Sequence, residues 1–288
     1  MTAADGFVRP NGGASDRELG GPRAVLEESS ATLALSIRLL GGFRAERCEG
    51  PVPDFAWQRR GAKQLTKLLA MSPGHALHRE QILETLWPRV GVDSARNSLA
   101  KSLHAARQAL EPGRLPRRGS LYIQIRDDMI ALNADHVLID ADNFHRLAQS
   151  ALRLATVPAY DAALAVYTGV LLPGDLYEDW PSERRRYLAD LNLRLLLGLA
   201  ETLAKHGDHH RAIDCLRSAL QEDQSREDAH RQLMRLHDAM GARDLALRQF
   251  EICRAQLDRE LNRAPDWETT MLYEELLANR VRQRTAGR

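Results

Sequence analysis

The sequence lacks the features that mark a secreted, disulfide-bonded or membrane-spanning protein. Its 288 residues include only three cysteines, which are widely spaced and form no Cys-x-x-Cys pair; this predicts reduced thiols rather than a disulfide framework. No apolar run approaches the roughly 20 residues that a membrane-spanning helix needs, and the N-terminus shows no basic stretch followed by an apolar segment. We therefore expect a cytoplasmic protein without a membrane partner.

Signatures of catalysis and of cofactor binding are missing as well. The chain has no Gly-x-Ser-x-Gly, no phosphate-binding loop, no Gly-x-Gly-x-x-Gly and no His-Glu-x-x-His. His206, His209 and His210 form a cluster, but Gly207-Asp208 predicts a turn that breaks the helical spacing a metal site would need. The sequence thus predicts no enzyme, no cofactor and no metal ion.

The composition that remains is that of a globular protein with an uneven charge. Apolar residues make up 44% of the chain and charged residues 27%, an ordinary balance for a folded domain. The net charge is +1, yet residues 33–135 hold 16 basic and 10 acidic side chains, while the flanking segments are net negative. A polyanionic partner should therefore be sought in the middle third.

The pattern of the first half predicts a winged helix-turn-helix behind a small sheet. Residues 33–48 alternate around Gly41-Gly42, which predicts two strands, and residues 52–57 suggest a third. Helical spacing follows from Ala62 to a stop at Ser72, then over 78–87, then from Asp93 or Ser94 to Glu111. Alternating runs at 121–125 and 129–132 read as a hairpin. Strands, three helices and a hairpin are the order of a winged helix.

The second half repeats itself with a period of 34 residues. Gly207 and Gly241, Ala212 and Ala246, Leu216 and Phe250, and Leu199 and Leu233 are each 34 residues apart. This period is typical of tetratricopeptide repeats, and Tyr160-x-x-Ala163-x-x-x-Tyr167 adds a partial copy out of period. A generic helical bundle with coincident spacing is the alternative. We expect a mainly α protein with a small β part, divided into tail 1–32, winged helix 33–135, all-α tetratricopeptide-like domain 136–280 and tail 281–288.

The third predicted helix presents two different faces. Leu99, Leu103, Ala106 and Leu110 share one face and should be buried. The opposite face carries hydrogen-bond donors, and no acid intrudes before Glu111. A helix that enters a major groove needs such a face, because carboxylates repel phosphates; an ordinary solvated helix is the alternative. The candidate DNA-binding residues are Asn97, Lys101 and His104 on this face and Arg96 and Arg107 on one flank.

Basic residues around this helix are candidates for phosphate contacts. Some surround the start of the first helix, where backbone amides also point outward, and others open the second helix or precede the hairpin. At the hairpin tip, an arginine could enter a minor groove, although Asp127 and Asp128 beside it oppose deep insertion. The candidates are Arg59, Arg60, Lys63, Arg79, Arg117, Arg118 and Arg126.

Two stretches resemble a known family. The run from LSIRLLGGFRAER through LETLWP to SARNSLAKSLHAARQALEPG resembles the OmpR/PhoB-type winged helix of the Streptomyces antibiotic regulatory protein family. The run from DADNFHRLAQSA through LLPGDLYEDW to LNRAP looks like the bacterial transcriptional activator domain that follows it there. Together they cover about residues 33 to 280.

The resemblance implies an activator that binds promoter repeats in double-stranded DNA and recruits RNA polymerase. In the family the third helix reads the major groove, which here corresponds to Asn97, Lys101, His104 and Arg107. Self-association as side-by-side protomers is a further expectation. The competing hypothesis is a helical-repeat scaffold or signalling adaptor whose winged helix binds protein; DNA binding should weaken steeply with salt, whereas protein binding should not.

Overall fold

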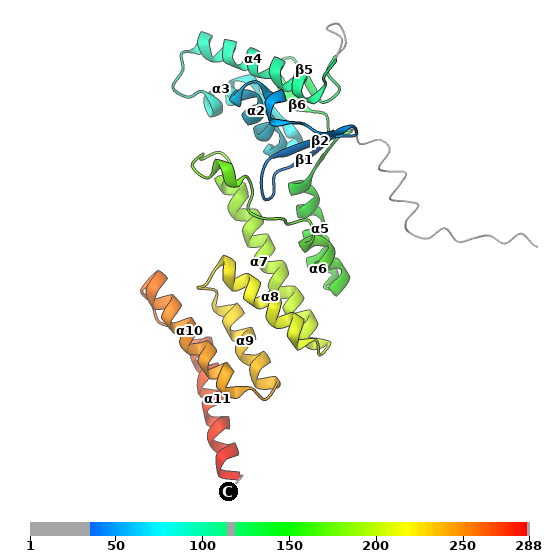
Figure 1. Ribbon diagram of the computed structural model, residues 1–288. Coiled ribbons are helices and arrows are strands. Elements are labelled where there is room, and N and C mark those ends of the chain that lie inside the picture. Colours follow the sequence, from blue (N-terminus) through cyan, green and yellow to red (C-terminus); the bar gives the residue numbers. More distant parts are fainter. Residues whose placement is uncertain (1–34, 114–118, 287–288) are drawn as a thin grey trace, which may run out of the picture.

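Residues 35–47 form the antiparallel strand pair that their alternation predicts. The computed structural model describes residues 35–113 and 119–286 (Figure 1). Gly41 lies between the two strands with φ of +72°, a left-handed conformation that glycine adopts without steric cost. A strand from far along the chain pairs in parallel with the first one. The sheet order is β3-β2-β1-β7, with β1 Leu35–Arg38, β2 Arg44–Arg47, β3 Gly50–Pro51 and β7 Val137–Ile139.

The third strand predicted over residues 52–57 is wrong. This segment contains a 3-10 helix, η1 (Asp54–Trp57), and the third strand is the shorter β3 just before it. The helical turn brings the Trp57 ring to 5.3 Å from the Phe43 ring and leaves Trp57 only 3% exposed. Burial of so large a ring is worth more than the one or two sheet hydrogen bonds that a longer strand would add.

All three predicted helices are present, within two residues of their expected ends. The second helix starts after His78, whose ring accepts a hydrogen bond from Glu80 N while Gln81 Oε1 accepts one from His78 N. This reciprocal arrangement satisfies two of the free N–H groups at the helix start. The predicted hairpin is also present, with a two-residue turn. The elements are α2 Arg60–Met71, α3 Arg79–Leu86, α4 Val92–Leu110, β5 Ile123–Arg126 and β6 Met129–Leu132.

A short strand, β4 (Ala76–His78), turns the hairpin into a three-stranded sheet of order β4-β6-β5. It lies between α2 and α3, where the sequence shows too few residues for alternation to be recognised. Ile123 and Ile130 of the hairpin are buried against the helices. Tyr122, just before β5, is also buried.

Helices α2 and α4 approach each other closely at a glycine. A Cβ atom added to Gly61 would lie 2.3 Å from Ser102 Oγ of α4 and 3.2 Å from the Trp87 ring. Ser102 itself is buried on the inner face of α4. The absence of a side chain at position 61 therefore allows the helix contact that holds α4 in place.

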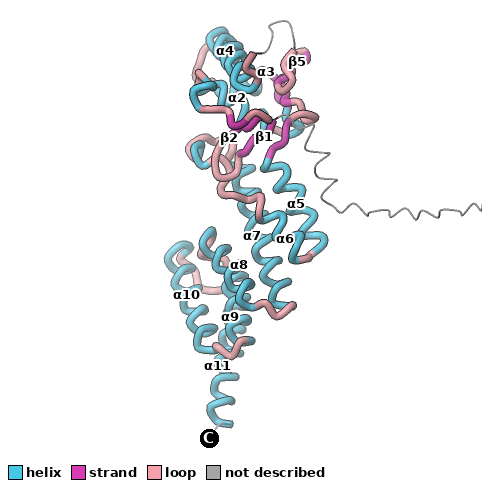
Figure 2. The backbone as a smooth tube through the Cα atoms, turned by 45° about the vertical axis from the view of Figure 1, so that its right-hand side comes forward, coloured by secondary structure: helices cyan, strands magenta, loops and turns pink. Residues whose placement is uncertain are grey.

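The remainder of the chain forms helix pairs stacked along one axis, so the molecule is elongated (Figures 1 and 2). The α5–α6, α7–α8 and α9–α10 pairs follow one another, and α11 ends the stack farthest from α4. The bounds are α5 Asp140–Leu154, α6 Val157–Leu164, α7 Ser182–Lys205, α8 His209–Glu222, α9 Glu227–Ala239, α10 Arg243–Leu261 and α11 Trp267–Ala286.

The 34-residue period is confirmed in the register of the helices. Gly207 and Gly241 lie in the two interhelix turns with φ of +81° and +75°. The paired positions 212 and 246, 216 and 250, and 199 and 233 are all buried in the helix contacts. The predicted fold class, a winged helix with an N-terminal sheet followed by a tetratricopeptide-like repeat domain, is therefore confirmed.

The N-terminal sheet is joined to the helical repeats by the carboxylate of Asp140. Its oxygens accept hydrogen bonds from Leu39 N at 2.8 Å, Leu40 N at 3.0 Å and Ala141 N at 2.7 Å, so one side chain joins the first turn of α5 to the residues that follow β1. Burial raises the pKa of Asp140, although these hydrogen bonds oppose the rise.

A second connection is made by Val170 and the LLPGDLYEDW segment that follows it. Leu172 N donates to Leu39 O at 2.9 Å, and Gly41 N donates to Val170 O at 3.0 Å. Within the short 3-10 helix η3 (Pro173–Asp175), the side chain of Asp175 is 6% exposed and accepts from Lys67 Nζ at 2.7 Å and from Gln64 Nε2 at 3.0 Å, both on α2. This segment therefore connects the helix-turn-helix to the repeats through hydrogen bonds and a buried ion pair.

One cluster of buried side chains runs from β1 through the helix-turn-helix to α9. Strand β7 lies just beyond the domain limit expected at residue 135, yet it pairs with β1. The limits 33–135 and 136–280 thus stay a prediction about folding units, and the described structure has no gap in packing between them.

Candidate nucleic-acid interface

Helix α4 has a buried face and an exposed face, as its sequence predicts. Ala95, Leu99, Ala106 and Leu110 are each no more than 3% exposed and pack into the core. Leu103 is half-buried, so it lies at the edge of this face. Burial of these side chains fixes the rotation of the helix and determines which residues face the solvent.

The exposed face carries Asn97, Lys101 and His104. These positions are spaced four and three residues apart, so their side chains line one face of the helix. Between Asp93 and Glu111 the helix carries no acid. Because α4 lies at the end of the molecule opposite α11, with the hairpin beside it (Figure 1), the described elements leave this face open.

Arg107 and Arg96 differ from the other candidates on α4. Arg107 is half-buried, and its Nη2 donates to the backbone oxygen of Ile123 at 2.9 Å. It therefore ties α4 to the hairpin. Arg96 is exposed, and its Nη1 lies 3.9 Å from Asp93 Oδ1 in the first turn. This is a loose surface pair that leaves the guanidinium free to bind elsewhere.

Three of the flanking cations already pair with acids of the chain itself. Arg60 lies 3.2 Å from Glu178, Lys63 lies 2.7 Å from Asp54, and Arg79 lies 3.9 Å from Asp128. The hydrogen bond and charge of Lys63 lower the pKa of Asp54. Each pair is partly exposed, so a phosphate can compete for the cation at modest cost.

The remaining flanking candidates have different surroundings. Arg59 is exposed at the start of α2, and no ion pair to it occurs within residues 35–113 and 119–286. Arg126 is exposed at the end of β5, where its Nη2 donates to Gln124 Oε1 at 3.1 Å. Arg117 and Arg118 lie outside the described residues.

Arg89 is a candidate that the sequence analysis missed. It is exposed in the connection between α3 and α4, immediately before the first turn of α4. The helix start directs free N–H groups outward, which favours an anion. The sequence does place Arg89 just after Pro88, which ends the second helix, and so close to the start of α4. An isolated arginine in a loop is, however, ordinarily only solvated.

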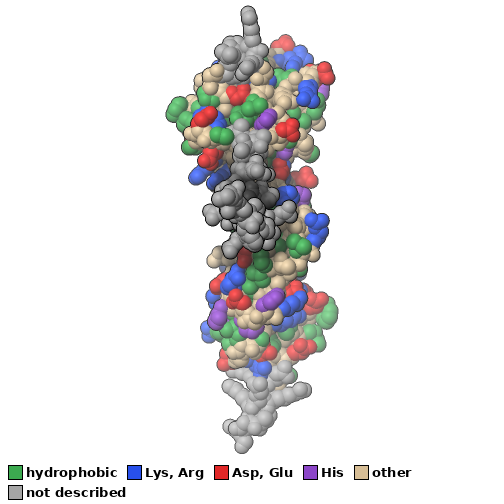
Figure 3. Space-filling view, turned by 90° about the vertical axis from the view of Figure 1, so that its right-hand side faces the viewer, with side chains coloured by type: hydrophobic (Ala, Val, Ile, Leu, Met, Phe, Trp, Pro, Cys, Tyr) green, Lys and Arg blue, Asp and Glu red, His purple; other side chains and the backbone are tan. Residues whose placement is uncertain are grey.

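The charge on the rest of the molecule is mixed. On the face drawn in Figure 3, blue cationic and red acidic side chains alternate along the visible length. A broad basic field is absent from the described surface seen there. DNA binding would thus depend on a local set of contacts around α4.

Metal binding and membrane crossing have no support among the described residues. No group of three His, Cys, Asp or Glu residues there could hold a metal ion, and His206 and His210 are separated by the turn at Gly207. Among the same residues, no helix is both long and apolar enough to cross a membrane. Among the described residues, Cys48, Cys215 and Cys253 form no disulfide.

Residues 139–277 match the family of bacterial transcriptional activator domains. The match begins at the end of β7, includes every helix from α5 to α10, and ends within α11. It confirms the domain predicted from LLPGDLYEDW and the neighbouring helices, and it supports the resemblance to the regulator family in which that domain follows a winged helix. The matched family is one of transcription regulators rather than of enzymes.

Among solved structures, EmbR of Mycobacterium tuberculosis in complex with a low-affinity phosphopeptide shares the fold, with a TM-score of 0.72 at 18% identity. The match covers 85% of this chain and 65% of that one, so the chain spans just under two thirds of the length of EmbR. The TPR2B domain of yeast Sti1, in a complex with pHsp70, matches 49% of this chain and 98% of its own at 17% identity, but its TM-score of 0.33 is too low to bear on the fold. The curated proteins include no match.

Proposed function

Because residues 139–277 form a bacterial transcriptional activator domain, we propose that this chain is a transcriptional activator that binds promoter DNA through α4. The observation that carries the proposal is the acid-free exposed face of Asn97, Lys101 and His104, which points outward because the opposite face of α4 packs into the core. A major groove admits one helix, and amide, ammonium and imidazole donors suit base edges and phosphates.

The residues of this interface would have different roles. Asn97 and His104 can exchange hydrogen bonds with base edges, whereas Lys101, Arg96, Arg59 and Arg89 supply charge for phosphates. Arg107 would act indirectly, because its bond to Ile123 O positions the hairpin against α4. Arg126 at the hairpin end would reach the neighbouring minor groove.

Selection of bound fragments from a random DNA pool by the full chain tests this proposal directly. We expect enrichment of a short sequence that occurs twice at fixed spacing, since the family resemblance implies side-by-side protomers. Operator affinity should fall steeply as salt rises, because bound phosphates release counterions. Affinity that does not change with salt would favour a protein-binding winged helix and the scaffold hypothesis.

Lys101→Ala tests the contribution of α4 to DNA binding. Lys101 is exposed and packs against nothing in the core, so the fold should be retained. Loss of a phosphate contact should weaken operator and random DNA alike and reduce the salt slope by about 1. The control is Arg248→Ala, which removes an exposed cation from α10 in the repeats. Equal binding by both variants would overturn the role of α4.

Recruitment of RNA polymerase is the second part of the proposal. A purified promoter that carries the selected repeats should be transcribed more strongly when the full chain is present. Full-length variants with exposed side chains of α9 to α11 replaced should occupy DNA without this gain, since the family match lies in residues 139–277. Stimulation equal to that of the parent by every such variant would place the activating surface in the winged helix.

A further inference from the structure

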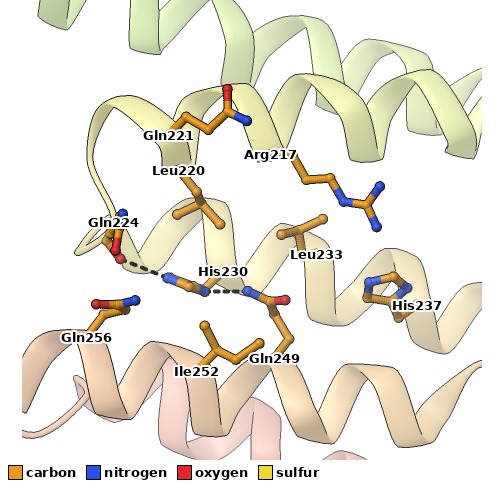
Figure 4. A pocket seen from close by; sticks show the side chains of 10 residues that line it. All are labelled: Arg217, Leu220, Gln221, Gln224, His230, Leu233, His237, Gln249, Ile252 and Gln256. Carbon is orange, nitrogen blue, oxygen red and sulfur yellow. Dashed lines mark hydrogen bonds between the residues drawn. The ribbon is translucent and has the colours of Figure 1, made fainter.

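An open slot runs between α8 and α10, the second helices of two successive repeats (Figure 4). Its volume is about 410 Å³. Leu220 of α8, Leu233 of α9 and Ile252 of α10 form its apolar middle. Ile252 is 43% exposed, so the apolar middle is open to solvent.

The floor of the slot is His230, which is fixed in one orientation. This side chain is 1% exposed, with Nε2 at 3.0 Å from Gln224 O and Nδ1 at 2.6 Å from Gln249 Nε2. A carbonyl oxygen can only accept, so Nε2 carries the proton and Nδ1 accepts from the Gln249 amide. Burial lowers the pKa of His230, which keeps the ring neutral. The floor is therefore preformed.

Amide side chains border the slot on both edges, with Gln221 on α8 and Gln249 and Gln256 on α10. Gln249 and Gln256 lie seven residues apart on α10, about 10.5 Å along the helix at about 1.5 Å per residue. Three residues of an extended chain span about the same distance, at about 3.3 Å each. Gln256 Oε1 is buried and has no hydrogen-bond partner among the described residues. Amide groups both donate and accept, as a peptide main chain does.

The cationic side chain of Arg217 and the imidazole of His237 lie together at the end of the slot away from Gln224 and Gln256 (Figure 4). The ten residues that line the slot include no carboxylate. Arg217 has only a loose pair with Asp214, at 3.8 Å on the surface. Burial lowers the pKa of His237, and the charge of Arg217 lowers it further. This end of the slot therefore favours an anion.

We propose that the slot binds a short extended peptide with apolar side chains and a carboxylate at its end beside Arg217 and His237. The glutamines pair with its main chain, and Leu220, Leu233 and Ile252 receive its side chains. The peptide belongs to a partner protein that the repeats would hold. The slot lies in α8–α10, away from α4 (Figure 1), so this proposal does not depend on DNA binding.

Fluorescence anisotropy with two tetrapeptide pools tests the proposal on the full chain. Both pools carry fluorescein at the N-terminus and Leu, Ile or Val at the first three positions. One ends in aspartate with a free carboxylate, and the other ends in asparagine amide. We expect the acidic pool to bind at least tenfold more tightly, since a charged hydrogen bond contributes about 1.5–3 kcal/mol and about 1.4 kcal/mol corresponds to tenfold.

Variants then locate the site. Arg217→Gln should abolish the preference for the acidic pool, and Ile252→Gln should weaken both pools. The matched control is Arg235→Gln, on the same helix as His237 but on the side that faces α7; it should retain the preference. Equal binding of both pools, equal effects of the two arginine variants, or no saturable binding of either pool would overturn the proposal.

An NMR titration of His237 gives a second readout. A carboxylate beside the ring should raise the pKa of His237 when the acidic pool is added, and the amide pool should leave this pKa unchanged. Folding defects would not produce this difference, because both pools are compared on the same protein. An equal response to both pools would show that no anion binds at this end.

Discussion

Replacing Asp175 with asparagine removes one charge from a buried ion pair and leaves the other behind. The side chains of Asp175 and Lys67 are only 6% and 11% exposed, so Lys67 would keep its charge without a carboxylate. Removal of one partner of a buried pair costs about 3–5 kcal/mol. We expect Asp175→Asn to lower the free energy of unfolding by about 3 kcal/mol, measured by urea denaturation.

The control for this variant is Glu178→Gln, three residues away. Glu178 pairs with Arg60, whose side chain is 82% exposed, and surface pairs contribute less than about 1 kcal/mol. If the two variants lost equal stability, the buried pair would not be what fastens α2 to the repeats.

The stability that Asp142 contributes should depend on pH. Burial alone would raise the pKa of Asp142, but hydrogen bonds and positive charge from His75 and Arg184 outweigh it and hold the pKa below 3.8. A lowered carboxylate pKa stabilises the folded state above the unfolded pKa, and this contribution is lost as pH falls through the folded pKa. Asp142→Asn should therefore lose stability at pH 7, and the difference from the parent should shrink below pH 3.8.

This loss should be about 1 kcal/mol at pH 7, because Asp142 is 38% exposed and solvent screens the pair. Thermal unfolding of parent and variant across pH 2.5–7 measures it, with Asp258→Asn on the exposed side of α10 as the control. A difference that grows toward low pH would contradict the assignment.

Single residues also show what can and cannot be predicted from the sequence. The spacing of α4 correctly placed Asn97, Lys101 and His104 on the exposed face. It could not show that Arg107 bends toward the hairpin, because Ile123 O comes from a strand that sequence spacing does not position in space. Ion pairs such as Arg60 with Glu178 join residues 118 positions apart, and no local pattern reveals them.

At the scale of elements, the contact between α2 and α4 gives a sharp prediction. Gly61→Val would place atoms within 2.3 Å of Ser102 Oγ and near the Trp87 ring. The two helices must then separate, which costs about 1–3 kcal/mol. We expect lower thermal stability and weaker operator binding, because α4 would shift relative to the hairpin.

Gly119→Ala is the control for this contact, since nothing lies within 4 Å of a Cβ at that position. It should leave both thermal stability and operator binding unchanged. A Gly61→Val variant as stable as the parent would mean that the two helices do not need their close approach.

Helices were more predictable than strands in this chain. A helix of eight or more residues repeats its apolar spacing at least twice within its own sequence. Strand β4 has three residues and β3 has two, too few for alternation to be visible. Both exist because a neighbouring strand offers hydrogen bonds, which is a tertiary circumstance.

At the scale of the whole molecule, the winged helix and the first repeats should unfold together. The buried cluster runs without interruption from β1 to α9. The environment of Trp57 in the winged helix can be followed by fluorescence, with the other three tryptophans replaced by phenylalanine, while far-UV circular dichroism follows mainly the repeats. We expect both signals to change at the same urea concentration.

Separate transitions would contradict this prediction and would favour independent folding of residues 33–135. Asp175→Asn serves as a second check. If the core is shared, this variant should move both signals to lower urea concentration by the same amount. A shift in the Trp57 signal alone would locate its effect within the winged helix.

The amino-acid sequence by itself determined the elements whose signal is periodic and local. These are the three helices of the winged helix, the hairpin, and the 34-residue repeat with its turns at Gly207 and Gly241. Burial of apolar faces produces that periodicity, so it can be read without knowing what covers each face. The tertiary structure alone decided how these elements are joined. The parallel pairing of β7 with β1, the hydrogen bonds of Asp140 with Leu39 and Leu40, and the pair of Asp175 with Lys67 join residues 100 or more positions apart. Such contacts depend on charge, hydrogen bonding and shape in three dimensions. They produce no regular spacing of residues in the sequence.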